Sequence, residues 1–222
     1  TNNQIKDLIL SSQFSTKEDL KLSIKTNSNN EMITDLFAGN AKPLVKKYDF
    51  IKGFEGGYLK FDSIEKNKVS NSNLKIFDFK LKEVPALTKL LTLASLQGIA
   101  DLLTGEGIRF NEFEMIFNNK AGLMTIEEIY SLGPSISILM DGYIQKDDLV
   151  SLRGTLVPAT TVNKVIGSIP LIGDILVGKK AGEGVFGVSF KIKGYPVDLK
   201  TTVNPIKTLT PRFITRTLEK IK

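Results

Sequence analysis

The chain has 222 residues, of which 41% are hydrophobic, so it can bury the core of one domain or of two small ones. It contains no Cys and no His, which excludes disulfides and thiolate metal sites and removes the usual general base of enzymes. The net charge is +6, but only four of the 30 basic residues are Arg, and the lysines are spread along the whole chain. Because nucleic-acid recognition favours arginine forks, no nucleic-acid partner is expected. The charge is typical of a soluble surface or of a mild attraction to anionic lipid.

Strands are predicted wherever apolar and polar residues alternate with a period of two. The clearest windows are 20–24, 136–140, 150–156 and 186–192. In two further windows, 74–81 and 108–117, the apolar residues change from one parity to the other. A β-bulge produces such a change, so we expect a bulge in each window, with a strand buried on both faces as the alternative.

Residues 107–157 show no helical pattern and are predicted to form a four-stranded meander. Its turns are expected near Asn118-Asn119, Gly133-Pro134 and Lys146-Asp147. Two pairs of adjacent carboxylates, Glu127-Glu128 and Asp147-Asp148, are candidates for acid–base chemistry. Because neighbouring residues of a strand point to opposite faces, we interpret both pairs as solvated turn or edge charges, and no catalytic residue is assigned.

Three helical segments are predicted, each beginning at a proline, which is well tolerated in a first helical turn. These prolines are Pro43, Pro85 and Pro158. Each segment ends at glycines that open a new strand, so a unit of strand, helix and strand occurs about three times with uneven spacing. The glycines of the last two exits are expected to serve the backbone conformation, often with positive φ: Gly105, Gly107, Gly182 and Gly184. The glutamates between them, Glu106 and Glu183, are interpreted as exposed turn residues.

The stretch "GSIPLIGDILVGKKAGEG" (167–184) contains two patterns that we reject. In "GDILVGKK" a phosphate-binding loop would need Ser or Thr at the last position, which is Lys180, so neither a nucleotide nor another cofactor is expected. A membrane span needs about 20 apolar residues, and Pro170 and Asp174 interrupt this run. The stretch is interpreted as the third helical insertion.

The last residues, "TLTPRFITRTLEKIK", predict an amphipathic basic helix capped by Thr210. Its apolar side includes Phe213 and Leu218, and its polar side includes Arg212, Arg216 and Lys220. Two interpretations stay open. The helix closes the open end of the sheet and protects that edge, or it lies on an anionic membrane surface or an envelope partner protein.

Three segments carry a resemblance to a known family: "LLTLASLQGIADLLTGEGIRFNEFE" (90–114), "LRGTLVPATTVNKVIGSIPLIGDILVGKKAGEGVFGVSFKIKG" (152–194) and "VNPIKTLTPRF" (203–213). Their order of motifs resembles the C-terminal region of AsmA-like proteins, in particular the YhdP-type branch of proteobacteria. The resemblance runs from about Pro43 to the end of the chain. Tyr195 departs from the pattern, because the family commonly places a small residue or a proline there.

The resemblance implies a single domain over residues 1–222, in which 1–40 are weakly matched leading strands, 41–207 core repeats and 208–222 a C-terminal helix. It implies a mainly β fold of the α+β class: a curved antiparallel sheet that forms an apolar groove, with inserted helices. Such proteins are similar to bridge-like lipid-transfer proteins. They are anchored in the inner membrane by an N-terminal segment, lie in the periplasm and move phospholipid toward the outer membrane without catalytic residues. The alternative is a structural adaptor that docks an outer-membrane or assembly partner and carries no lipid.

Alternation with polar neighbours places one set of apolar side chains on one face of the sheet. This set is predicted to line a groove for phospholipid acyl chains: Phe186, Val188, Phe190, Ile192, Ile136, Ile138, Met140, Phe113, Met115 and Phe117. The same residues could instead form a closed core.

Overall fold

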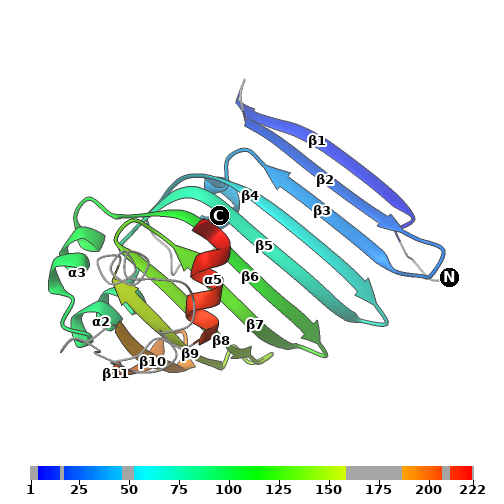
Figure 1. The fold of residues 1–222 in the computed structure, drawn as a ribbon. Helices are drawn as coiled ribbons and strands as arrows, with labels where there is room; N and C mark the ends of the chain where they lie inside the picture. The colour runs from blue at the N-terminus through cyan, green and yellow to red at the C-terminus, as the bar shows by residue number, and fades with distance from the viewer. Residues whose placement is uncertain (1–4, 16–17, 47–52, 159–186, 207–210, 222) are drawn as a thin grey trace.

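The computed structural model describes residues 5–15, 18–46, 53–158, 187–206 and 211–221. They form one antiparallel sheet of eleven strands in which each strand pairs with its neighbours in sequence, from β1 to β11 (Figure 1). The fold is therefore mainly β, as expected, with few helices.

The strands are β1 (Asp7–Ser15), β2 (Glu18–Thr26), β3 (Met32–Ala38), β4 (Gly53–Lys66), β5 (Val69–Lys82), β6 (Ile108–Lys120), β7 (Leu123–Leu132), β8 (Ile136–Ile144), β9 (Val150–Pro158), β10 (Gly187–Tyr195) and β11 (Asp198–Ile206). The helices are α1 (Lys42–Val45), α2 (Pro85–Leu93), α3 (Gln97–Thr104) and α5 (Pro211–Ile221).

The meander predicted for residues 107–157 is confirmed as β6–β9. Its turns lie at Ala121-Gly122, between β7 and β8, and at 145–149, so the first is three residues later than expected. Gly122 has a φ of +81°, which is the left-handed conformation that a tight hairpin turn requires.

The two predicted phase changes do not arise from extra residues. On both sides of the change, β4 pairs with β5 and β5 with β6 in an unbroken register. Gly57 in β4 and Asp78 in β5 lie opposite each other at this level, with φ of +78° and +52°. Left-handed residues at one level of adjacent strands rotate the backbone there. Side chains of both parities, such as Leu59 and Phe54, consequently join one core. The expectation of a bulge in these two windows is wrong.

A bulge does occur in β7, where sequence reasoning placed none. Ile126 pairs with Phe117 of β6 and Glu128 pairs with Ile116, so Glu127 is the extra residue. Without this insertion Ile126 and Glu128 would share a face. With it, Ile126 lies on the same face as Phe117, and Glu128 points to the opposite face.

Helices α2 and α3 connect β5 to β6 and pack on one face of the sheet at one end of the strands (Figure 1). Pro85 opens α2, and Pro43 lies in the first turn of α1. Pro158 ends β9, and the helix expected after it lies outside the described residues. Helix α2 also contacts β11, so the connection between two central strands reaches the last strand of the sheet.

The largest buried cluster joins these helices to the sheet. Leu90, Leu91 and Leu103 are buried together with strand residues such as Phe79 and Phe110. The rings of Phe54, Phe79 and Phe110 form an aromatic stack across β4, β5 and β6. The ring centroids of Phe54 and Phe79 are 5.3 Å apart, and those of Phe79 and Phe110 are 5.4 Å apart.

Candidate functional site

One face of the sheet is apolar from β1 to β11. Directly opposed residues of antiparallel strands share a face, so the register fixes which side chains form rows across the sheet. The central row has one residue from each strand: Leu10, Leu22, Leu36, Phe61, Leu74, Met115, Ile129, Met140, Gly154, Phe190 and Val203.

The rows on either side of it are also uncharged but include small polar residues, such as Ser63 and Ser72, whose hydroxyls lie 2.9 Å apart. One is Ser12, Leu20, Ala38, Leu59, Ile76, Phe113, Ser131, Ile138, Leu156, Val188 and Pro205. The other is Leu8, Ile24, Thr34, Ser63, Ser72, Phe117, Ile126, Gly142, Leu152, Ile192 and Thr201. None of the three rows contains an ionisable side chain. We call these rows the apolar face.

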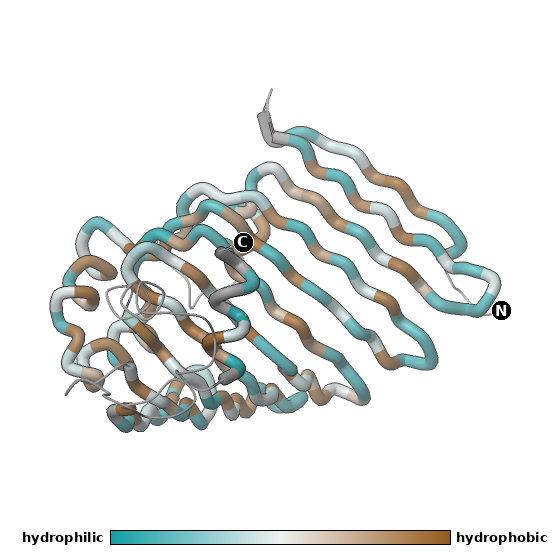
Figure 2. The backbone as a smooth tube through the Cα atoms, in the orientation of Figure 1, coloured by the Kyte–Doolittle hydropathy of each residue, from teal (hydrophilic) through white to brown (hydrophobic). Residues whose placement is uncertain are grey.

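The opposite face differs in composition. Its row beside the central one is Ser11, Lys21, Phe37, Lys60, Lys75, Glu114, Tyr130, Leu139, Thr155, Ser189 and Asn204. Figure 2 shows the resulting alternation of hydrophilic and hydrophobic positions along the strands. We call this second side the polar face.

The structure places nine of the ten predicted lining residues on the apolar face, and Phe186 lies outside the described residues. They differ in exposure. Val188, Phe190, Ile136 and Ile138 are buried in the cluster that includes α2 and α3. Ile192, Met140, Phe113, Met115 and Phe117 are half-buried. Part of the predicted lining is therefore core in this structure.

Sequence reasoning did not assign the exposed part of the apolar face. Over β1–β4 the central row is partly exposed: Leu22, Leu36 and Phe61 are half-buried, and Leu10 is 43% exposed. The period-two pattern of β2 identified Leu22, but no window was recognised in β1 or β3. In both strands apolar residues occupy both parities, such as Ile9 beside Leu10 in β1 and Ile33 beside Met32 in β3, so neither strand alternates strictly.

A shallow pocket of about 360 Å³ over β1–β4 lies on the polar face. Its lining includes residues of two rows of that face, with side chains such as Lys21, Lys60 and Asp62.

Helix α5 packs on the polar face, over a small apolar patch. Phe213 is 1% exposed and lies against Tyr130, Leu139 and Val157, with the rings of Phe213 and Tyr130 6.4 Å apart in an edge-on arrangement. The interpretation that α5 protects an edge of the sheet is thus wrong, because the helix covers a face of β7–β9. Contact of α5 with a membrane or an envelope partner stays a prediction.

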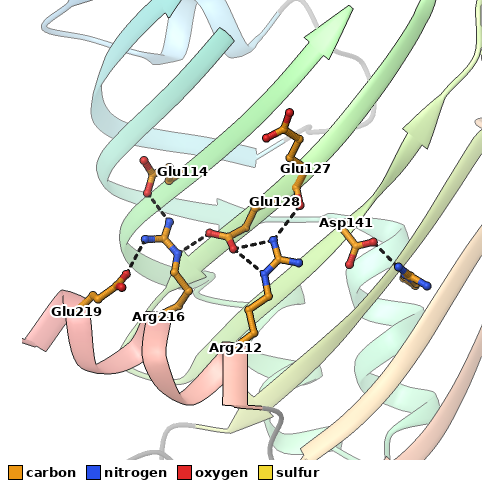
Figure 3. A network of polar contacts seen from close by, with 8 residues as sticks. Glu114, Glu127, Glu128, Asp141, Arg212, Arg216 and Glu219 are labelled. Carbon is orange, nitrogen blue, oxygen red and sulfur yellow. Dashed lines mark hydrogen bonds and ion pairs between the residues drawn. The ribbon is translucent and has the colours of Figure 1, made fainter. Parts of the chain in front are cut away.

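Both arginines of α5 also turn to the sheet (Figure 3). Arg216 donates to Glu114 at 2.7 Å, to Glu128, and to Glu219 within the helix at 3.2 Å. Arg212 donates to Glu128 at 3.0 Å and to the carbonyl oxygen of Glu127 at 2.9 Å. The bulge in β7 supplies two of these acceptors.

The carboxylate acceptors of this network are buried, so their negative charges need the arginines as partners. Glu128 is 8% exposed and Glu114 is 6% exposed, and Lys75 adds a further ion pair to Glu114 at 3.0 Å. Burial disfavours the charge of Arg216, but hydrogen bonds to Glu114 and Glu219 and the charge of Glu128 outweigh burial, so the pKa of Arg216 lies above its usual value. The interpretation of Glu128 as a solvated charge is wrong.

The sequence held one signal for this network. Arg216 follows Phe213 by three residues, which places it only about 60° from Phe213 around the helix axis. An arginine at that angle reaches the surface on which the apolar stripe packs. The side chains of Leu218 and Lys220, the other predicted contact residues of the helix, lie outside the described ones.

The predicted glycines separate into two kinds. Gly107 has a φ of +91°, and a Cβ there would lie 2.6 Å from Cγ of Lys82 and 2.8 Å from the carbonyl oxygen of Leu81. Gly105 ends α3 with a φ of −95°, so positive φ is the wrong expectation for it. Gly182 and Gly184 lie outside the described residues, and Glu106 is exposed as expected.

No family model, curated protein or solved structure matches this chain. Within the described part of the chain, no helix has the length and apolar character that a membrane crossing demands.

Proposed function

We propose that this protein binds the acyl chains of phospholipid along its apolar face and has no enzymatic role. The proposal rests on one observation: three rows without an ionisable group cross all eleven strands, while the opposite face carries lysines and carboxylates. Lipid sites are lined mainly by aliphatic and aromatic side chains, with polar groups at their borders.

The dimensions of the face suit an extended ligand. Ten interstrand spacings of about 4.8 Å give rows about 48 Å long, measured along the sheet. Over β1–β4 the central row is partly exposed, at Leu10, Leu22, Leu36 and Phe61, so this region provides the contact surface. In this proposal the acyl chains lie on the part of the apolar face between β1–β4 and helices α2 and α3.

The resemblance to AsmA-like proteins of the YhdP type supports the same substrate class. It adds a location in the periplasm, within a protein anchored in the inner membrane, and a role in carrying phospholipid toward the outer membrane. The family expectation and the apolar face are independent lines of support, because the rows follow from strand register alone.

Site-specific photo-crosslinking tests the proposal at neighbouring positions that lie on opposite faces of the sheet. A photoreactive phenylalanine analogue replaces Leu22 or Leu36 on the apolar face, or Lys21 or Phe37 on the polar face. We expect phospholipid adducts in mass spectra of the first two proteins and none in those of the second two. Lipid extraction of the unmodified protein provides a second measurement.

Adducts at all four positions would indicate nonspecific association and contradict the proposal. A folded protein with neither adducts nor co-purified lipid would favour the adaptor interpretation instead.

A further inference from the structure

Three hydroxyl side chains interrupt the apolar face on three adjacent strands. Thr34 of β3 lies opposite Ser63 of β4, and Ser63 lies opposite Ser72 of β5, so the three share one row and one face. The residues that flank them in this row, Ile24 of β2 and Phe117 of β6, are apolar. We call Thr34, Ser63 and Ser72 the hydroxyl row.

The hydroxyl row marks a change of polarity along the strands. Alternate residues of a strand share a face, at steps of about 6.7 Å. On β4 the residues of the apolar face are, in order, Leu59, Phe61, Ser63 and Glu65, and opposite them on β5 are Ile76, Leu74, Ser72 and Ser70. Leu59 belongs to the buried cluster that includes α2 and α3, whereas Glu65 lies beside the β4–β5 turn. The order from apolar to hydroxyl to charged positions matches the order of acyl chain, ester and head group along a phospholipid.

The hydroxyl groups differ in burial, which decides which of them is free to bind a ligand. Ser72 is 7% exposed, whereas Ser63 and Thr34 are half-buried. The Oγ atoms of Ser63 and Ser72 are 2.9 Å apart, and either of them can be the donor by geometry. Because a buried donor without an acceptor costs more than a donor that water reaches, Ser72 donates to Ser63. The hydrogen of the Ser63 hydroxyl is then available to water or to a ligand on the apolar face.

A lipid on the apolar face displaces water from these hydroxyls. A hydrocarbon segment offers no acceptor, so acyl chains lying over the hydroxyl row would leave Thr34 and Ser63 without partners, which is unfavourable. A charged group would find no opposite charge within the row, which has no ionisable side chain. The row therefore favours a neutral acceptor, and the carbonyl oxygen of an ester is such a group.

We propose that the hydroxyl row binds the ester carbonyl oxygens of a diacyl lipid, with Thr34 and Ser63 as the donors and Ser72 as the buried group that orients Ser63. The acyl chains extend from there over the central row toward α2 and α3, and the head group lies toward the β4–β5 turn. This inference rests on the proposed function. It adds the chemical linkage that the face selects and the direction in which each lipid lies.

The contact between Ser63 and Ser72 also has a purely structural interpretation. Hydrogen-bonded hydroxyls on opposed residues stabilise a pair of antiparallel strands. Such a role makes no use of Thr34 and gives no dependence on the linkage of a bound lipid. Selectivity between lipids therefore separates the two roles, whereas a measurement of stability alone does not.

Competition between ester-linked and ether-linked lipid tests the hydroxyl row. The full chain is incubated with vesicles that contain equal amounts of diacyl and dialkyl phosphatidylcholine of the same chain length. It is then re-isolated and extracted, and the ratio of the two bound lipids is measured by mass spectrometry. The two lipids share head group and chains, but only the diacyl lipid carries carbonyl oxygens. We expect the wild type to enrich the diacyl lipid about tenfold, as two neutral hydrogen bonds provide.

The variants remove hydroxyls without leaving a buried group unpaired. Ser63→Ala combined with Ser72→Ala removes both partners of one hydrogen bond, and with Thr34→Val added the protein should bind both lipids equally. Thr34→Val alone leaves the serine pair intact and should lower the enrichment to about threefold. Ser63→Thr keeps a hydroxyl and should keep the preference. Ser23→Ala is the matched control, because it removes a half-buried hydroxyl from the polar face of β2 and should leave the ratio unchanged.

The possible results separate this inference from the proposed function. Equal binding of the two lipids by the wild type overturns the hydroxyl row as an ester site and leaves acyl-chain binding on the apolar face standing. A preference that survives the triple variant overturns the assignment to these three residues, and an enrichment unchanged by Thr34→Val overturns the role of Thr34. Recovery of neither lipid from the folded wild-type protein overturns both this inference and the proposed function.

Discussion

The apolar face has two regions that share one sequence pattern and differ in what covers them. In β2 and in β10, apolar residues alternate with polar ones in the same way, and the register carries Leu22 and Phe190 into the same row. Phe190 is 3% exposed beneath the cluster that includes α2 and α3, whereas the row is open at its β1 end. Alternation therefore determines which side chains share a face, and the connections between strands determine which part of that face becomes core.

The difference has a simple topological cause. The connection between β5 and β6 is 25 residues long and forms two helices, while β1–β2 and β2–β3 are joined by short segments. A short connection cannot cover the face beside it. The helices of the long connection bury apolar residues at their own end of the strands, and they reach as far as β11.

The largest expected effect separates core from open face with one substitution in each region. Val188→Asp places a charge in the buried cluster and should cost about 4 kcal/mol of unfolding free energy. Leu22→Asp places the same charge on the half-buried region and should cost about 1 kcal/mol. Urea denaturation followed by circular dichroism measures both.

The same pair refines the proposed function. Leu22→Asp should remain folded and lose lipid, because the charge lies in the contact surface. Equal destabilisation by the two substitutions would show that the open region is covered in solution and that the two regions do not differ.

The second prediction contrasts two arginine–carboxylate pairs. Removing Arg216 leaves Glu114 and Glu128 buried without their main partner, so Arg216→Ala should cost about 3 kcal/mol. Arg153→Ala is the control: Arg153 is 73% exposed and pairs with Asp141 on the same face, and its loss should cost about 0.5 kcal/mol. Denaturant unfolding gives both values. A small loss for Arg216→Ala would mean that α5 is not held on the sheet by this network.

Much of the sheet was predictable, because period-two alternation is a local property. The windows in β2, β8, β9 and β10, the meander of β6–β9 and the helix at Pro85 all follow from short-range pattern. The shared face of the lining residues follows as well, once neighbouring strands are assumed to pair in order. A meander with short turns leaves few other pairings.

The coverage of the face and the α5 network were not predictable in the same way. Glu128 next to Glu127 has the pattern of a solvated pair, and only the bulge directs it to the face on which α5 packs. Its partner, Arg216, lies 88 residues later. Contacts between such distant segments depend on where the chain returns, and no local window contains that information.

The smallest expected effect concerns the exit of the long connection, where the helices meet the sheet. Gly107→Ala should cost about 2 kcal/mol, because φ of +91° is unfavourable for alanine and the new Cβ would meet Lys82 and Leu81. Gly105→Ala should cost less than about 1 kcal/mol, because its φ is negative and its nearest neighbour is the carbonyl oxygen of Asp101 at 3.2 Å. Thermal unfolding distinguishes them. If both substitutions cost the same, the left-handed turn into β6 is not what fixes α3 above the apolar face, and the packing of Leu103 must position the helix instead.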